Sequence, residues 1–217
     1  MSGPLSPQSS VLSTPAYALV LAAGRGSRFG GAKLLAPLDG RPLAAHVATT
    51  VAAAIQAGYL GGGIAVGRVD DSSLAWYFET CGLKWVVNPA ADEGVSTSLR
   101  LGLAELSAAP VQPAPGAAMI LLADQPLVRI EVIAGLVEHW RRTGRSVRPR
   151  YAAHPAEPGH PVLLDRRLWP LADSLEGDVG FGSALRLGPD AVDLVDVAGG
   201  NPDIDTPNDL SLLPDVS

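Results

Sequence analysis

Apolar residues along the chain recur with two different periods, and the two alternate from one segment to the next. Short apolar runs bounded by Gly, Pro or Ser have the length and composition of buried strands. Longer segments carry an apolar residue at every fourth position, as Leu43, Val47 and Val51 do, which predicts amphipathic helices. The alternation favours an α/β fold. The predicted strands cover residues 18–23, 63–67, 83–87, 117–123 and 191–197, and the predicted helices cover residues 43–57, 71–81, 99–106, 130–142 and 183–187.

Two further extended pieces depart from this alternation. Val147–Tyr151 and Pro161–Leu164 are joined by a loop rich in Pro and Gly, a composition typical of turns. Two strands joined in this way predict a hairpin outside the parallel core. The expected architecture is therefore α/β in three α/β/α layers, Rossmann-like, with a mostly parallel sheet and a small β-hairpin.

The chain of 217 residues is long enough for one α/β domain with a substantial core, and we expect residues 16–217 to form it. Residues 1–15 are rich in Ser and Pro and carry no charged side chain, so they are predicted to be a disordered tail. They lack the basic start of a signal peptide, and no apolar run approaches the roughly 20 residues of a membrane span. The expected location is the cytoplasm, with no membrane partner.

The net charge of −6 disfavours nucleic acid as a partner, because binding a phosphate backbone requires a basic face. The single cysteine, Cys81, excludes an internal disulfide and a cysteine metal cluster. An acidic protein that binds an anion must gather its positive charge in one place.

The segment after the first predicted strand is such a place. Glycines let a ligand approach the backbone, and successive N–H groups form a concave anion site to which Arg and Lys add charge. Ala32 stands between the last glycine and the lysine, which excludes a Walker loop, and the G-x-G-x-x-x-G spacing excludes the dinucleotide fingerprint. The sequence predicts a polyphosphate site at the carboxyl edge of the sheet. The segment contains Gly24, Arg25, Gly26, Arg28, Gly30, Gly31 and Lys33.

A second polar segment directly follows the predicted strand 83–87. Asn88 begins it, and Gly94 and Ser98 lie further along. Polar groups at the carboxyl edge of an open α/β sheet fall in its ligand crevice, which favours a binding role. The alternative is structural, with Ser96 as the N-cap of the next helix.

Carboxylates that could bind a metal occur in two further segments. Asp124 ends the most apolar strand, and magnesium prefers hard oxygen ligands from one or two such side chains. The alternative is that Asp124 caps helix 130–142. Asp203 and Asp205 stand at alternate positions of an extended segment and hence on one face, and Thr206 can cap a last helix.

LAAGRGSRFGGAK, residues 21–33, resembles the signature of nucleotidyltransferases of the molybdenum-cofactor type. At its second small residue the segment has Ala23, and in this it is similar to the cytidylyltransferase branch of that family, which has Ala and not Gly at this position. Four more segments follow in the family's order: NPAADEGVSTSL, DQP, GHP and DIDTPND. The resemblance covers residues 17–210 and implies a fold like that of nucleotide-diphospho-sugar transferases. Family members often carry Arg where Phe181 or Gly182 stands, so the resemblance does not extend to the acceptor contacts of that Arg.

The resemblance implies a role for each matching residue. One of these residues, the lone histidine His160, has an alternative role: it could stabilise its own loop instead of binding the acceptor. The implied nucleotide-binding residues are Leu21, Ala22, Ala23, Gly24, Arg25, Gly26, Lys33, Asn88, Gly94 and Ser98. The implied acceptor-binding residues are His160, Asp178 and Gly180. The implied catalytic residues are Arg28, Lys33 and Asp124, and the implied magnesium ligands are Asp124 and Asp205, with Asp203 in place of Asp205 as the fallback.

The implied reaction transfers a nucleoside monophosphate from a triphosphate, CTP by resemblance, to a phosphorylated acceptor such as a molybdopterin-type cofactor, and releases pyrophosphate. Mg²⁺ is the implied cofactor, and a recipient molybdoenzyme is a further possible partner. Two alternatives stay open. One is a sibling nucleotidyltransferase with another nucleotide or a sugar or polyol phosphate acceptor. The other is a non-catalytic maturation factor that binds and delivers a cofactor.

Overall fold

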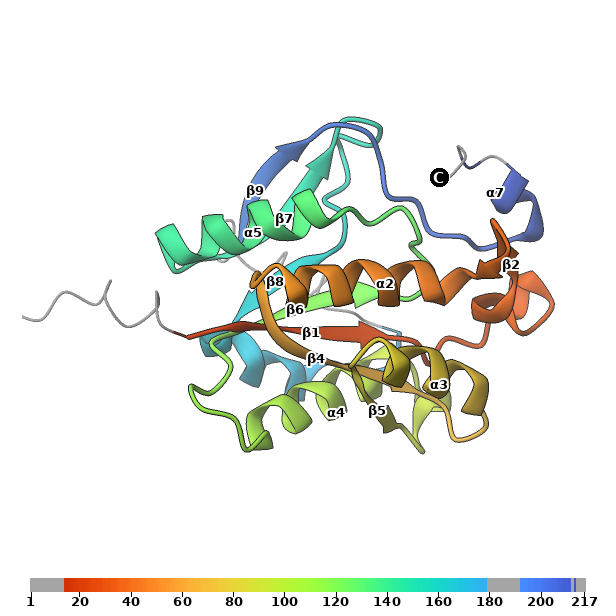
Figure 1. Cartoon of the computed structure of the whole chain (residues 1–217), viewed down its shortest axis with the longest axis horizontal. Coiled ribbons are helices and arrows are strands. Elements are labelled where there is room, and N and C mark those ends of the chain that lie inside the picture. Colours follow the sequence, from red (N-terminus) through yellow and green to blue (C-terminus); the bar gives the residue numbers. More distant parts are fainter. Residues whose placement is uncertain (1–13, 179–191, 212, 214–217) are drawn as a thin grey trace, which may run out of the picture.

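The computed structural model describes residues 14–178, 192–211 and 213, and Figure 1 shows their arrangement. The strands are β1 (Ala16–Leu21), β2 (Pro37–Leu38), β3 (Arg41–Pro42), β4 (Leu60–Gly67), β5 (Lys84–Val87), β6 (Ala117–Leu122), β7 (Ser146–Tyr151), β8 (Val162–Asp165) and β9 (Val192–Val197). The α-helices are α2 (Leu43–Gln56), α3 (Ser72–Thr80), α4 (Val95–Ala108), α5 (Ile130–Thr143) and α7 (Pro207–Ser211). The 3₁₀ helices are η1 (Ser27–Phe29), η2 (Lys33–Leu35), η3 (Ala91–Glu93) and η4 (Arg166–Ser174).

In this part of the chain, seven strands form one sheet in the order β5-β4-β1-β6-β8-β7-β9. Strands β1, β4, β5 and β6 run parallel, and β9 runs parallel to β7. Strand β8 is antiparallel to both of its neighbours, β6 and β7. The predicted α/β class with a mostly parallel sheet is confirmed.

Side chains of the central strand β1 alternate between the two faces of the sheet and join two separate cores. Ala18 and Val20 pack with residues of α2, α3 and α5, whereas Leu19 packs with residues of α4 and η4. All three side chains are fully buried. These two cores make the three layers, and Figure 1 shows α2 and α4 on opposite sides of β1.

The predicted hairpin is in a different place. Val147–Tyr151 and Pro161–Leu164 were expected to form it outside the parallel core, but β7 and β8 are antiparallel members of the main sheet. The reason is that Val147, Val162, Leu163 and Leu164 are all fully buried, so these strands need cover on both faces. The small separate hairpin is instead β2 and β3, which pair antiparallel around a turn.

Two predicted element boundaries are wrong for steric reasons. Strand β4 begins at Leu60, before the predicted Gly63, because the Tyr17 ring lies against Gly61 and Gly62, where a Cβ would come within 2.7 Å of it. Helix α4 begins at Val95 rather than Leu99, and no side chain accepts a capping hydrogen bond at its N-terminus. Its N-cap is Gly94, where a Cβ would lie 2.2 Å from the Gly177 backbone.

Some predictions concern residues that the structure does not describe. They are the helix at residues 183–187, Gly180, Phe181 and Gly182, and residues 1–13 of the predicted tail. Within the tail, Pro15 is described, and its carbonyl accepts a hydrogen bond from the Gly116 N–H at 2.9 Å. No described helix combines the length and apolar character needed to cross a bilayer.

Helix α4 packs closely on β1 at Gly102, where a Cβ would lie 2.3 Å from Leu19 Cδ1. We predict that Gly102→Ala lowers the free energy of unfolding by about 1–3 kcal/mol, because Leu19 is fully buried and has no room to yield. Gly135→Ala on the exposed face of α5 is the matched control and should raise stability by about 0.5–1 kcal/mol. Urea unfolding measures both; equal stability of the two variants would contradict the close packing.

Candidate functional site

The glycine loop between β1 and η2 is shaped by its own backbone. Gly26 has a positive φ of 57°, and a Cβ on it would come within 2.8 Å of Lys33 Cβ, so only glycine lets these two turns meet. The Gly26 carbonyl accepts hydrogen bonds from the N–H groups of Phe29 and Gly31, which closes the loop. Lys33 is thereby brought back beside the end of β1.

Backbone N–H groups remain available at the start of this loop. The Ala22 N–H is the last one used by the sheet, and it donates to the Val66 carbonyl at 2.8 Å. Within the described residues, the N–H groups of Ala23, Gly24, Arg25 and Gly26 donate no backbone hydrogen bond. Four successive free donors next to a cationic side chain can hold an anion.

Lys33 is the centre of an ion-pair cluster at the carboxyl edge of the sheet. Its Nζ lies 2.6 Å from Asp124 Oδ2 and 3.3 Å from Asp205 Oδ1, and its side chain is only 9% exposed. Arg28 Nη1 lies 2.7 Å from the other oxygen of Asp205. The structure therefore brings together the three predicted catalytic residues and both favoured magnesium ligands, Asp124 and Asp205, with the lysine in direct contact with the two acids.

Asp203 and Asp205 reach this cluster because the residue between them is anchored. Ile204 is fully buried against Leu38 and Leu43, and its N–H donates to the Asp124 carbonyl at 3.1 Å. Its neighbours consequently point the other way, as their alternation predicted. Asp203 accepts a hydrogen bond from Gln125 Nε2 at 2.9 Å. Burial, followed by the charge of Asp124, raises the pKa of the Asp203 carboxyl.

The alternative role for Asp124 does not hold, because α5 is preceded by Arg129 and has no side-chain cap. The predicted last helix is present, and α7 begins at Pro207, directly after Thr206. Asp209 accepts hydrogen bonds from the N–H groups of Asp205 and Thr206 at 2.9 and 2.7 Å, and these bonds lower the pKa of its carboxyl.

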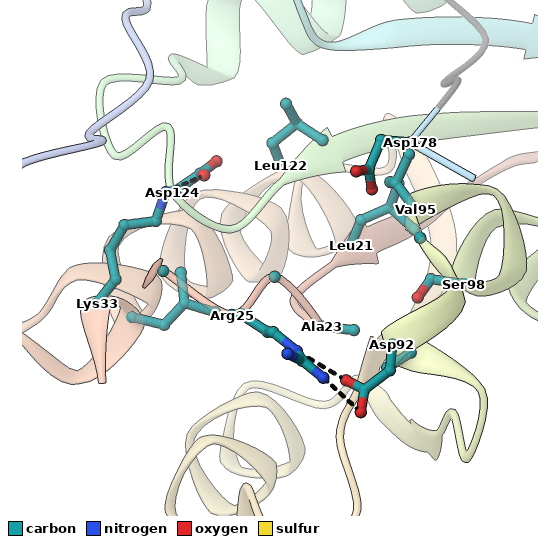
Figure 2. Close-up of a pocket in the computed structure, with 15 residues that line it drawn as sticks. Leu21, Ala23, Arg25, Lys33, Asp92, Val95, Ser98, Leu122, Asp124 and Asp178 are labelled. Atoms are coloured by element: carbon teal, nitrogen blue, oxygen red, sulfur yellow. Dashed lines mark hydrogen bonds and ion pairs between the residues drawn. The ribbon is translucent and has the colours of Figure 1, made fainter. Parts of the chain in front are cut away.

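A cavity of about 470 Å³ opens between the glycine loop and the N-terminus of α4, a size in the range of small-molecule sites. Figure 2 shows Lys33 and Asp124 at one end of it and Ser98 and Asp92 at the other. Nine of the residues predicted to bind the nucleotide or the acceptor line it together with Asp124. From the nucleotide set they are Leu21, Ala23, Gly24, Arg25, Gly26, Lys33, Gly94 and Ser98, and from the acceptor set Asp178.

Asn88 and Ala22 are buried and do not belong to the cavity lining. The Asn88 amide donates to Thr97 Oγ1 and Ser98 Oγ, both at 2.9 Å, and its oxygen accepts from the Ala90 N–H at 3.0 Å. Asn88 thus holds the segment before α4 in shape. Ser96 is not the N-cap, because it lies inside the first turn of α4 and its hydroxyl has no partner in the described chain.

Two of the predicted acceptor residues lie in different surroundings. Asp178 faces the cavity, and the preceding Gly177 contacts α4, whose Ser96 N–H donates to the Gly177 carbonyl at 3.1 Å. His160 is outside the cavity lining, and its Nδ1 is buried without a hydrogen-bond partner among the described residues. Its carbonyl accepts hydrogen bonds from Tyr151 and Asn201, at 2.9 and 3.3 Å. Burial raises the pKa of the Tyr151 phenol to about 12.

Sequence reasoning missed an ion-pair group on the far wall of the cavity. Asp92 from η3 contacts Arg25 and Arg68, each at 2.6 Å. Hydrogen bonds from Arg25 and then Arg68 lower the pKa of the Asp92 carboxyl to about 2, and the same contact raises the pKa of Arg25. Arg68 directly follows β4, so the rule that polar residues after parallel strands gather at one edge would have found it.

A family model described as "MobA-like NTP transferase domain" matches residues 18–193, which include the glycine loop, Asp92 and Asp124. The chain belongs to this family. Curated relatives of this MobA-like domain include the bifunctional protein GlmU of Acinetobacter baumannii (strain AYE), 31% identical over 156 residues, and that of Xylella fastidiosa (strain M23), 29% identical over 161 residues. The alignments cover 69% and 70% of the chain but only 31% of each relative.

Solved structures resemble the MobA-like domain over almost its whole length. The Rv0371c protein of Mycobacterium tuberculosis H37Rv is 28% identical, with a TM-score of 0.74, over 92% of this chain and 97% of that one. A complex of Rv0371c with manganese gives 25% identity and a TM-score of 0.71 over the same shares of the chains. A nucleotidyl transferase from Methanothermobacter thermautotroptrophicus, 23% identical over 91% of this chain and 95% of that one, shares the fold with a TM-score of 0.68.

Burial lowers the pKa of the His160 imidazole to about 4, and the Arg148 charge acts in the same direction. An unfolded chain takes up this proton near pH 6.5, so stability is lost as the pH falls from 6.5 toward 4. We predict that between pH 7 and pH 5 the unfolding free energy of the parent falls by about 1–2 kcal/mol more than that of His160→Gln. Urea unfolding at both pH values tests this; equal losses would place the imidazole in contact with solvent.

Proposed function

We propose that this MobA-like protein is a nucleotidyltransferase that moves a nucleoside monophosphate from a triphosphate to a phosphorylated acceptor and releases pyrophosphate. The observation that carries the proposal is the position of Lys33, at the end of a loop with free N–H groups and in contact with Asp124 and Asp205. A polyphosphate needs such donors, and a reaction at its α-phosphorus needs nearby charge neutralisation.

The chain's own residues account for binding and alignment. The N–H groups from Ala23 to Gly26 would hold the phosphates, with Arg25, Arg28 and Lys33 offsetting their charge. Gly94 and Ser98 would lie beside the base at the other end of the cavity. No covalent intermediate is required, because a phosphate oxygen of the acceptor attacks the α-phosphorus and pyrophosphate leaves. Catalysis would come from alignment and charge neutralisation.

The carboxylates fit a magnesium ion that is shared with the substrate. Among the described residues, no group of three or more His, Cys, Asp or Glu side chains is arranged to hold a metal alone. Mg²⁺ usually takes one or two protein carboxylates and completes its shell with phosphates and water. Asp124 and Asp205 would hold it, with Asp203 as the fallback, and the ion would polarise the phosphate.

The proposed nucleotide is CTP and the proposed acceptor a molybdopterin-type cofactor, for which Ala23 and the order of the five motifs are the support. A recipient molybdoenzyme would follow from that acceptor. Asp178 and Gly180 remain proposed acceptor residues, and His160, outside the cavity lining, would act on the acceptor only through its loop. Pyrophosphate release measured with CTP, GTP, ATP and UTP, each with a set of phosphorylated acceptors, tests both choices.

We predict that Asp124→Asn lowers magnesium-dependent pyrophosphate release by at least about 100-fold, because the variant loses both the metal ligand and the partner of Lys33. The circular dichroism spectrum should stay that of the parent. Glu105→Gln is the matched control: this carboxylate lies on α4 and pairs with Lys84 at 2.7 Å, so its loss should leave turnover unchanged. Parental turnover in Asp124→Asn would exclude Asp124 as a metal ligand.

Comparing Asp205→Asn with Asp203→Asn identifies the second metal ligand. We predict that Asp205→Asn raises the magnesium concentration for half-maximal release by at least about tenfold, and Asp203→Asn by less than about threefold. The Asp205 carboxylate is 42% exposed and beside Lys33, whereas Asp203 is held by Gln125. A magnesium titration of both variants decides; the reverse order would assign the metal to Asp203.

A further inference from the structure

Two arginines from different segments share the carboxylate of Asp92 at one wall of the cavity. Arg25 donates from Nε to Asp92 Oδ1 at 2.9 Å, and its Nη2 lies 2.6 Å from Oδ2. Arg68 Nη2 lies 2.6 Å from Oδ1. Figure 2 shows Arg25 extending from the glycine loop to Asp92, with both contacts drawn. This ion pair links the loop after β1 to the segment before α4.

The two arginines are held very differently. The Arg68 side chain is 24% exposed, and it has a second carboxylate, Asp70, at 4.0 Å. Its Nη1 is buried and has no hydrogen-bond partner in the described part of the chain, so Arg68 has one unused donor. Arg25 is 63% exposed and contacts only Asp92 among the described ion pairs. Arg25 is therefore the partner that can leave, and Arg68 the one that stays.

Arg25 also has open space beside it, next to the proposed triphosphate site. A hollow of about 270 Å³, lined by Arg25, Arg68 and Asp70, adjoins the main cavity and shares Gly24 and Lys33 with it. The backbone of Arg25 belongs to the run of free N–H groups where the triphosphate is proposed to bind. An exposed ion pair is weak, whereas a triphosphate offers several negative charges to a guanidinium.

We propose that Asp92 is a positioning residue: it holds Arg25 before the nucleotide binds and releases it to the triphosphate, while Arg68 keeps the Asp92 carboxylate neutralised. The inference rests on the proposed function and adds a substrate-driven exchange to the same site. Because Asp92 competes with the phosphates for Arg25, it also weakens the binding of polyanions that bring no further contacts to the cavity.

The test uses inorganic tripolyphosphate, which has the phosphates of the substrate and no base. Calorimetric titration at low ionic strength should show about threefold to fivefold tighter binding to Asp92→Asn than to the parent, the size expected for one exposed ion pair. In an Arg25→Gln background, Asp92→Asn should change the affinity by less than about 1.5-fold, because Arg25, the arginine proposed to leave Asp92, is absent. Simple charge repulsion would act in both backgrounds, so equal effects would overturn the proposal.

Arg150 and Asp196 provide a matched control, since they form another exposed bidentate pair, at 2.6 and 3.0 Å, between β7 and β9. Asp196→Asn should leave tripolyphosphate affinity unchanged. The nitrogen-15 resonance of Arg25 Nε, assigned by its loss in Arg25→Gln, should shift when tripolyphosphate is added to the parent. An unshifted Arg25 resonance at saturation, or equal tightening in Asp196→Asn, would contradict the exchange.

The inference and the proposed function can fail separately. Nucleotide-dependent pyrophosphate release without coupling between positions 25 and 92 would overturn the exchange and keep the enzyme. Coupling measured with tripolyphosphate, but no release from any of the four nucleoside triphosphates, would overturn the enzyme and keep the exchange. No binding of tripolyphosphate at all would contradict both.

Discussion

The buried ammonium group of Lys33 is the constraint on which the site depends. A cation that is 9% exposed is costly unless carboxylates lie beside it, and two of them do, at 2.6 and 3.3 Å. These carboxylates belong to segments far apart in sequence, at the end of β6 and before α7. The lysine therefore ties the glycine loop to both segments, and removing either acid leaves its charge less compensated.

The backbone makes this contact possible before any side chain is considered. Gly26 lets the loop fold back onto Lys33, and Ile204 bonds to the Asp124 carbonyl while its side chain enters the core. Both contacts fix the position of a charged side chain. The ion cluster is thus held by one steric condition and one apolar anchor, and electrostatics acts on a geometry that is already set.

Local pattern was enough to predict the layers, the described α-helices and the carboxyl edge of the sheet, because the period of a strand or a helix can be recognised within one segment. Asp124 was found because it directly follows a strand at that edge, and Asp205 because DIDTPND matches a segment of the family. What local pattern could not predict is which segment meets which. Three features depend on partners far along the chain. They are the place of β7 and β8 in the main sheet, the start of β4 against the Tyr17 ring, and the contact of Asp92 with Arg25 and Arg68.

Polar residues at the carboxyl edge of the sheet look alike in the sequence but differ in how deeply they are buried. Gln125 donates to Asp203 and accepts from Asn201 at 3.1 Å, and Asn201 in turn donates to the His160 carbonyl. Since a buried polar group needs hydrogen-bond partners within the protein, these side chains bond to one another and hold their loops together. Asn88 acts in the same way before α4. The side chains left to meet a ligand are those whose polar atoms still face the cavity, and Arg25 and Asp178 are among them.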